Sequence, residues 1–211
     1  VVHSFETIDL TVGRKIFKMG NSSSYAPSDR ITSKDLNDPL FPKEYGVWMG
    51  GADFFVDATT ITLGFFPFFS PMRVSSATSR WSGTGSNTLA GTQFRNLGDT
   101  SSYSGLSTTS ITPINNYPDA SIKNMQGVLR VKTTIRGWDL FVASYHGFNY
   151  YPVLRVLQKK EPTTGALVGL DLIKEHVKVR NDSAGFSTTF GKFEIHGETL
   201  YQRAYGRKDD D

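Results

Sequence analysis

Cysteine is absent from this chain of 211 residues, which excludes a disulfide framework and zinc–thiolate sites. Long hydrophobic runs are absent too. The longest apolar stretch, residues 61–69, is interrupted by Thr62, Gly64 and Pro67, whereas a transmembrane helix needs ~20 apolar residues. If the chain enters a membrane, we therefore expect a β-barrel, because only helices and closed barrels satisfy the backbone in lipid.

A strong excess of positive or negative charge is absent as well. Lys and Arg number 23 against 20 Asp and Glu, giving a net charge of +3, and the basic residues are scattered. A balance this mild predicts no nucleic-acid partner. Glycine (20 residues) and aromatic side chains (13%) are plentiful, and together with abundant Ser and Thr they favour β structure with tight turns and open loops.

The stretch from Ile122 to Tyr151 predicts a long β-hairpin with its turn at Arg136-Gly137. Each strand is about 12 residues long, against ~5–6 in ordinary strands. Length, alternation and aromatic ends are typical of a transmembrane hairpin. In the first strand, one face is expected to carry Gly127, Leu129, Val131, Thr133 and Ile135, and the other Gln126, Arg130, Lys132 and Thr134, with Val128 as an exception.

Tight turns and long connections alternate strictly along the chain. Tight turns are predicted at residues 57–58, 136–137 and 191–192, and long surface loops at about 18–44, 67–121 and 152–170. A short helical turn is expected at Ser33–Leu36, and residues 171–190 are expected to form one strand. The fold class predicted is all-β, an up-and-down antiparallel transmembrane β-barrel with short turns at one end.

This interpretation gives about seven strands over residues 1–211. With an odd number, the first and last strands run parallel and cannot close an antiparallel barrel, and bacterial single-chain barrels have even numbers. We therefore expect part of a barrel, either a fragment of a longer one or one chain of a split one. Further chain segments or subunits would close it.

In a barrel, the polar strand faces would line the lumen. Opposite charges on facing strands could set up a transverse field that orients polar solutes, or they could pair with one another and fill a plugged lumen. The residues predicted to line the lumen are Asp9, Arg130, Lys132, Glu194, His196 and Glu198.

Catalytic and metal chemistry are not expected. The four histidines lie far apart in sequence, and Asp35, Asn37 and Asp38 lack the spacing of a calcium loop. No Gly-x-Ser-x-Gly elbow is present. The sequence therefore predicts no enzyme, no cofactor and no metal site.

Three short N-terminal motifs carry a resemblance to a known family. They are Gly13-Arg14-Lys15, Met19-Gly20, and residues 29–36, which begin with Asp29 and end with Asp35-Leu36. They resemble Gly-Arg-Gln, Trp-Gly and Asp-x-x-Asn-Pro-x-Asp-Leu in large porin-like β-barrels of Gram-negative outer membranes. Lys15, Met19 and Thr32-Ser33 replace the family's residues.

Two later segments are similar to the same family. Residues 66–73 resemble its Pro-x-Phe-x-Pro-x-Arg segment, and residues 137–147 resemble its Gly-x-Asp-Leu…Tyr-x-x-Gly hairpin with a shorter spacing after the tyrosine. Some members are encoded near resistance-nodulation-division exporters. The resemblance implies a loop site comprising Gly13, Arg14, Gly20, Asp29, Asp35 and Leu36, and it implies no catalytic residues.

The function expected from residues and resemblance together is transport: a porin-like channel or export conduit in the bacterial outer membrane. Its expected partners are outer-membrane lipid and an exporter or other envelope complex. Two alternatives remain open. One is a soluble β-rich binding or shell protein, carbohydrate-binding or capsid-like. The other is a barrel that forms a sheath around a partner protein.

Overall fold

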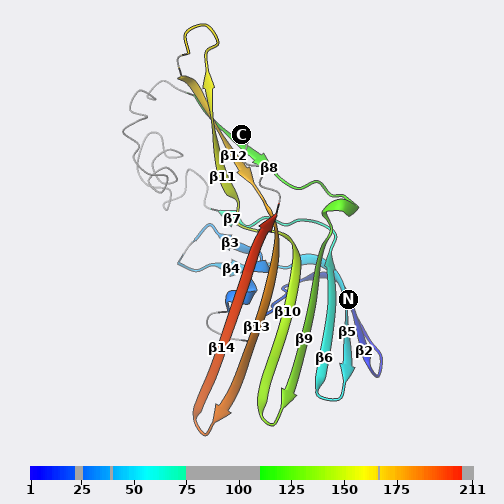
Figure 1. Ribbon diagram of the computed structural model, residues 1–211. Helices are drawn as coiled ribbons and strands as arrows, with labels where there is room; N and C mark the ends of the chain where they lie inside the picture. The colour runs from blue at the N-terminus through cyan, green and yellow to red at the C-terminus, as the bar shows by residue number, and fades with distance from the viewer. Residues whose placement is uncertain (22–25, 39, 75–109, 166, 206–211) are drawn as a thin grey trace.

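The main sheet contains eight antiparallel strands in the order β1-β2-β5-β6-β9-β10-β13-β14 (Figure 1). The computed structural model describes residues 1–21, 26–38, 40–74, 110–165 and 167–205. The strands are β1 (Val2–Ser4), β2 (Ile8–Lys15), β5 (Val47–Val56), β6 (Thr59–Phe66), β9 (Gln126–Ile135), β10 (Trp138–Phe148), β13 (Lys178–Phe190) and β14 (Phe193–Tyr205). In the described part of the chain, no helix is long and apolar enough to span a membrane.

The all-β class, the antiparallel sheet and the three tight turns are confirmed. Val56 pairs with Thr59, Ile135 with Trp138, and Phe190 with Phe193, so each hairpin has a two-residue connection. Asp57, Arg136, Gly137 and Gly191 have φ between 51° and 82°, the left-handed region that tight hairpin turns use. These turns lie together at the lower end of the sheet in Figure 1, here the turn end; the opposite end is the long-loop end.

The predicted count of seven strands is wrong. Residues Val2–Ser4 form an additional short strand, β1, which pairs with Thr11, Leu10 and Asp9 of β2. The amino group of Val1 also donates to the carbonyl of Val12 at 2.8 Å. With eight strands, β1 and β14 run antiparallel, so the argument against closure from an odd number fails. The described strands form an open sheet whose edges are β1 and β14.

The long connections contain more regular structure than the sequence predicted. Residues 18–44 hold a 3₁₀ turn, η1 (Pro27–Ile31), and the short strands β3 (Lys34–Leu36) and β4 (Lys43–Glu44). The predicted helical turn at Ser33–Leu36 is wrong, because β3 pairs there with β4 and with β7 (Arg73–Val74). The helical turn lies earlier, where Pro27 occupies its first turn, a position that suits proline's fixed φ.

A second sheet projects beyond the long-loop end (Figure 1). Its strands are β11 (Val153–Lys160), β12 (Leu167–Glu175) and β8 (Ser110–Asn116), in the order β11-β12-β8. The predicted loop at 152–170 is therefore largely a hairpin. Residues 171–190 are not one strand, since β12 ends at Glu175 and β13 begins at Lys178 in the other sheet. Most of the predicted loop 67–121, residues 75–109, lies outside the described residues.

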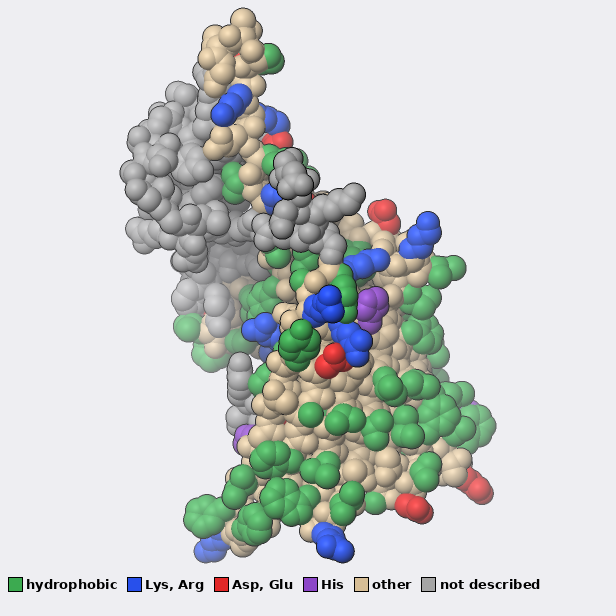
Figure 2. All heavy atoms as spheres, viewed as in Figure 1, with side chains coloured by type: hydrophobic (Ala, Val, Ile, Leu, Met, Phe, Trp, Pro, Cys, Tyr) green, Lys and Arg blue, Asp and Glu red, His purple; other side chains and the backbone are tan. Residues whose placement is uncertain are grey.

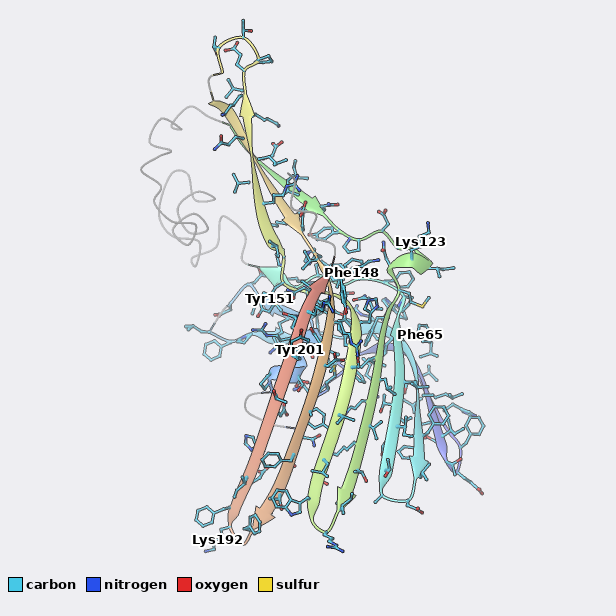
Figure 3. The ribbon with its side chains drawn as sticks, viewed as in Figure 1. Phe65, Lys123, Phe148, Tyr151, Lys192 and Tyr201 are labelled. Atoms are coloured by element: carbon cyan, nitrogen blue, oxygen red, sulfur yellow. The ribbon has the colours of Figure 1, made fainter. Side chains whose placement is uncertain are left out.

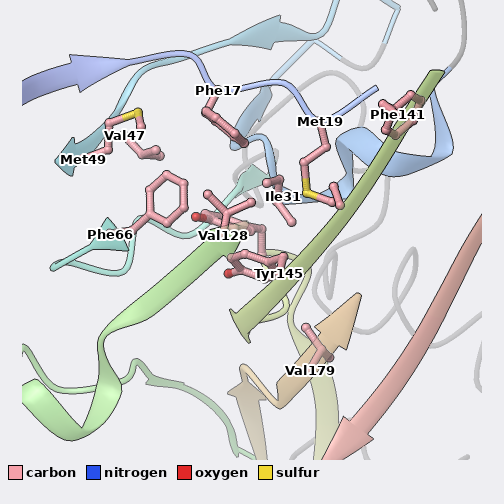
Figure 4. Packing of buried hydrophobic residues seen from close by; sticks show 12 residues of the cluster. Phe17, Met19, Ile31, Val47, Met49, Phe66, Val128, Phe141, Tyr145 and Val179 are labelled. Carbon is pink, nitrogen blue, oxygen red and sulfur yellow. The ribbon is translucent and has the colours of Figure 1, made fainter. Parts of the chain in front are cut away.

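The main sheet has two unlike faces. The inner face, as we call it, is the one on which residues 17–21 and 26–33 pack. Phe17, Met19 and Ile31 meet Phe66, Val128 and Tyr145 there (Figure 4). This contact explains why Val128 breaks the polar pattern of its strand. The outer face carries the apolar row that includes Leu129 and Ile135, which are 45% and 53% exposed. The core therefore lies on the face that the sequence marks as polar.

Candidate functional site at the inner face

The six residues predicted to line a lumen all lie on the inner face. Cross-strand partners share a face of a sheet, and the register places Asp9, Asp53, Thr62 and Arg130 in one row across four strands. A second row joins Lys132 through Phe141 and Gly185 to Glu198. Glu194 and His196 are on the same face of β14 as Glu198, nearer the turn end.

Glu198 attaches the N-terminal segment to the last strand of the sheet. Its two carboxylate oxygens accept hydrogen bonds from the Asn21 N–H at 2.8 Å and the Ser28 hydroxyl at 3.0 Å. A Cβ at residue 20 would lie 2.6 Å from the Ala26 Cβ and 2.7 Å from Glu198 Oε1. The close approach of Ala26, whose Cβ has no side-chain torsion that could move it away, favours glycine at residue 20.

Asp29 of η1 organises the same segment from within. Its Oδ1 accepts hydrogen bonds from the backbone N–H groups of Met19 at 2.7 Å and Gly20 at 2.9 Å. Burial raises the pKa of the Asp29 carboxyl above its ordinary value, although the two backbone hydrogen bonds act in the opposite direction. Asp29 therefore joins η1 to Met19 and Gly20.

Arg130 contributes a third attachment from the centre of the sheet. Its guanidinium donates to the Lys18 carbonyl at 3.2 Å and to Asn21 Oδ1 at 3.0 Å. Beside it lies a cavity of about 140 Å³ whose polar lining includes Lys15, Lys18, Asp53 and Arg130. Asp53 accepts a hydrogen bond from Thr62 at 2.5 Å, so both signs of charge border this inner cavity.

The remaining motif residues shape the connection between β2 and β5. Gly13 has φ +134°, and the Arg14 guanidinium donates twice to the Gly46 carbonyl, at 3.2 and 3.1 Å. Asp35 accepts from the Asn37 N–H at 3.0 Å and lies 3.7 Å from Arg73. Leu36 pairs with Val74 at the end of β3. These contacts hold the ends of the loop in place around Gly20 and Asp29.

A larger cleft of about 540 Å³ opens where the two sheets meet. Arg14, Arg73 and Lys174 supply positive charge to its lining, and Tyr45, Phe69, Tyr117 and His176 supply rings. Arg73 lies over the Tyr45 ring, 5.2 Å from its centre. At this end the chain therefore offers a wide, basic and aromatic opening, while the inner cavity below it is narrow.

Two residues that the sequence did not single out complete the attachment. Asn21 and Ser28 both reach Glu198, and Asn21 also reaches Arg130. The bond from Asn21 to Glu198 uses a backbone N–H group, which every residue except proline carries, so the residue type gives no signal for it. The nearest signal is the turn-forming character of Asn21 and Ser28.

The arrangement provides hydrogen-bonding groups and charges of both signs. Among the described residues, no group of three or more His, Asp or Glu side chains is placed to hold a metal ion. The chain matches no protein-family model, no curated protein and no solved structure.

Proposed function

We propose that the main sheet is the wall of a porin-like β-barrel that spans the bacterial outer membrane and serves as a channel or export conduit. The observation that carries this proposal is the distribution of apolar side chains. The inner face carries the polar and charged rows and is partly covered by the chain itself. The outer face is apolar and exposed.

The outer face is continuous across the long strands of the sheet. Its exposed large apolar residues are Leu10, Val12, Trp48, Val56, Leu63, Phe65, Leu129, Ile135, Trp138, Leu140, Val142, Phe186, Phe190, Phe193, Ile195 and Tyr201. A soluble protein rarely exposes so large an apolar surface, whereas lipid-facing strands of a barrel require one. This distribution disfavours the soluble binding or shell protein.

Charges on this face are confined to one end. In the seven strands from β2 to β14, the outward-facing charged residues are Arg14, Lys178, Arg180, Asp182 and Arg203, all toward the long-loop end. On β14 the outward-facing residues from Phe193 to Tyr201 carry no charge. This uncharged stretch is roughly 26 Å long at ~3.3 Å per residue. A lipid-facing band is ~25 Å tall and has aromatic residues at both edges; strand tilt shortens the stretch to about 20 Å.

The segment that packs on the inner face, residues 17–21 and 26–33, favours a channel or conduit over a sheath. A sheath around a partner protein needs an inner face that stays clear, yet these residues lie across it from β5 to β14. Arg130, Asp29 and Glu198 hold the segment there, and the inner cavity beside it has charges of both signs. Such a segment narrows a lumen and gives polar solutes groups to contact.

The test is a charge placed in the middle of the outer face. Val142, which is 56% exposed, is replaced by lysine, and the matched control is Thr189→Lys, at an exposed position on the inner face. Each variant is folded into phosphatidylcholine vesicles and unfolded in urea. We expect Val142→Lys to lower the free energy of unfolding by about 2–4 kcal/mol, and Thr189→Lys to change it by less than about 0.5 kcal/mol.

The outcome that contradicts the proposal is equally concrete. If the protein stays in the soluble fraction and both variants unfold as the parent does, the outer face does not contact lipid. If Val142→Lys is destabilised as expected, conductance across a planar bilayer, measured with the same preparation, distinguishes an open channel from a closed wall.

A further inference from the structure

A cluster of basic side chains lies on the outer face directly above the uncharged stretch. We call it the basic patch and define it as His146, Lys178, Arg180, Arg203 and Tyr205. The register brings the residues together, because His146 pairs with Arg180, Arg180 with Arg203, and Lys178 with Tyr205. Figure 2 shows Lys and Arg side chains gathered beside a histidine on the upper part of this face.

Positive charge exceeds negative charge in the patch. Arg180 Nε lies 2.9 Å from Asp182 Oδ2, and Asp182 also accepts a hydrogen bond from Ser144 at 2.6 Å. Among the outward-facing residues of β10, β13 and β14, Asp182 is the one carboxylate, against the three cations Lys178, Arg180 and Arg203. A net positive charge therefore remains on an exposed surface.

Aromatic rings and a backbone carbonyl hold two of the cations in position. The Arg203 guanidinium lies 5.3 Å from the centre of the Tyr205 ring, and Lys178 Nζ lies 5.4 Å from that of Phe148. Lys178 also donates to the Lys123 carbonyl at 3.2 Å, which places η4 (Ile122–Asn124) at the border of the patch. These contacts leave spare N–H donors on both side chains, because Arg has five and Lys three.

The position of the basic patch along β14 indicates which part of a membrane it would face. Arg203 is only two residues beyond Tyr201, the last member of the uncharged stretch on β14, so the patch begins about 7 Å further along the strand. In a membrane-spanning sheet, this is the level at which hydrocarbon gives way to lipid headgroups. Basic clusters at that level attract anionic headgroups, and arginine binds phosphate through paired hydrogen bonds.

We propose that the basic patch binds the phosphate groups of anionic lipids at the long-loop end of the membrane. This inference rests on the proposed membrane function. It adds a lipid class and named residues: Arg203 and Lys178 as the principal phosphate donors, Arg180 as a cation shared with Asp182, and His146 and Tyr205 as the flanking rings.

The experiment measures lipid selectivity separately from membrane insertion. The protein is folded into vesicles of phosphatidylcholine alone and of phosphatidylcholine with phosphatidylglycerol, and insertion is followed by the mobility difference between unboiled and boiled samples. The protein is also folded into an equal mixture of the two lipids, and the lipids that remain bound after extraction in detergent are counted by native mass spectrometry.

The variants are Arg203→Gln, Arg203→Lys and the double variant Lys178→Gln/Arg203→Gln. Lys192→Gln, at the turn end (Figure 3), is the control for loss of one charge.

We expect insertion into both vesicles and a preference for phosphatidylglycerol in the parent protein. Arg203→Gln should reduce that preference about fivefold and the double variant further, while Arg203→Lys and Lys192→Gln keep it. Insertion without a preference, or an equal loss in Lys192→Gln, overturns the lipid-binding proposal and leaves the membrane function standing. Failure to insert into either vesicle overturns both.

Discussion

His176 lies at the junction of the two sheets, between β12 and β13, and is 8% exposed. Its Nδ1 is 2.8 Å from the Asn149 carbonyl; because a carbonyl only accepts, this nitrogen carries a proton. The ring centres of Phe69 and Tyr117 lie 4.5 and 5.8 Å away. Burial lowers the pKa of His176 below 6.5, although the hydrogen bond to Asn149 acts in the opposite direction.

This lowered pKa predicts a loss of stability in mild acid. The unfolded chain binds a proton at His176 more readily than the folded chain does, so the free energy of unfolding falls as pH drops from 6.5 through the lower folded pKa. Each tenfold difference in proton affinity between the two states corresponds to about 1.4 kcal/mol of stability. We expect His176→Asn, which keeps an N–H donor, to lose less stability than the parent between pH 7.5 and 5.0.

Urea unfolding at the two pH values measures that difference. The change in unfolding free energy between the two pH values is determined for the parent and for His176→Asn, and one is subtracted from the other. The subtraction removes contributions common to both proteins, including that of Asp29, whose raised pKa makes the folded state less stable as pH rises above 3.8. His146→Asn is the control for a histidine on the outer face. Identical pH dependence in the parent and His176→Asn would rule out His176 as the source.

Single residues were the hardest to predict from the sequence. The alternation around Val128 was visible, but the reason for its exception was not, since Phe17 and Met19 reach it from more than a hundred residues away in sequence. Glu198 was placed on the correct face without its partners. Side-chain type fixes which face a strand residue occupies, whereas its contacts depend on where a distant backbone segment packs.

At the scale of elements, residues 17–21 and η1 are attached to the inner face through side chains of the sheet, Glu198 and Arg130. Their contacts with β14 pass through Glu198. We expect Glu198→Ala to remove two charge-assisted hydrogen bonds, each worth about 1.5–3 kcal/mol. Amide exchange of residues 17–21, followed by mass spectrometry, should become at least about tenfold faster, because the loosened segment opens more often.

The matched control is Glu194→Ala, which removes an exposed carboxylate from the same face of the same strand. It should leave exchange in residues 17–21 unchanged. If both variants behave alike, or if neither accelerates exchange, Glu198 does not hold the segment.

Strands and turns of the main sheet were largely predictable, because alternation and two-residue turns are local signals. The exceptions have physical reasons. Strand β1 has three residues, too few to show a period. The break at His176 was missed because β12 and β13 are both strands and the chain changes sheet between them, a choice made by tertiary packing. The hairpin β11–β12 was missed because its charged residues resemble a loop.

At the scale of the whole molecule, the two ends of the sheet should lie on opposite sides of the membrane. Long loops face outward and short turns inward in outer-membrane barrels. The chain has no cysteine, so one introduced thiol reports a single position. Lys123 and Lys192 mark the long-loop end and the turn end (Figure 3).

We expect Lys123→Cys to react with a membrane-impermeant maleimide in intact cells. Lys192→Cys should react only after the outer membrane is opened, since a charged reagent does not cross lipid. Labelling is read from the mass of the purified protein, and the parent chain supplies the unreactive control. Equal labelling of both thiols in intact cells would contradict the proposed orientation.

The up-and-down antiparallel order of the main sheet could be predicted at this scale, because the alternation of short and long connections reflects that order directly. The projecting sheet could not, since β12 pairs in parallel with β8, and a parallel partner leaves no turn between the two strands to recognise.

The bond between Asn21 and Glu198 also sets an order of events in time. It joins residues 177 positions apart. The long strands of the main sheet, in contrast, follow one another across the sheet in chain order. Closing a loop costs more conformational entropy the longer the loop is. We therefore expect the bond between Asn21 and Glu198 to form after the hairpins of the main sheet, whose paired strands are close in sequence.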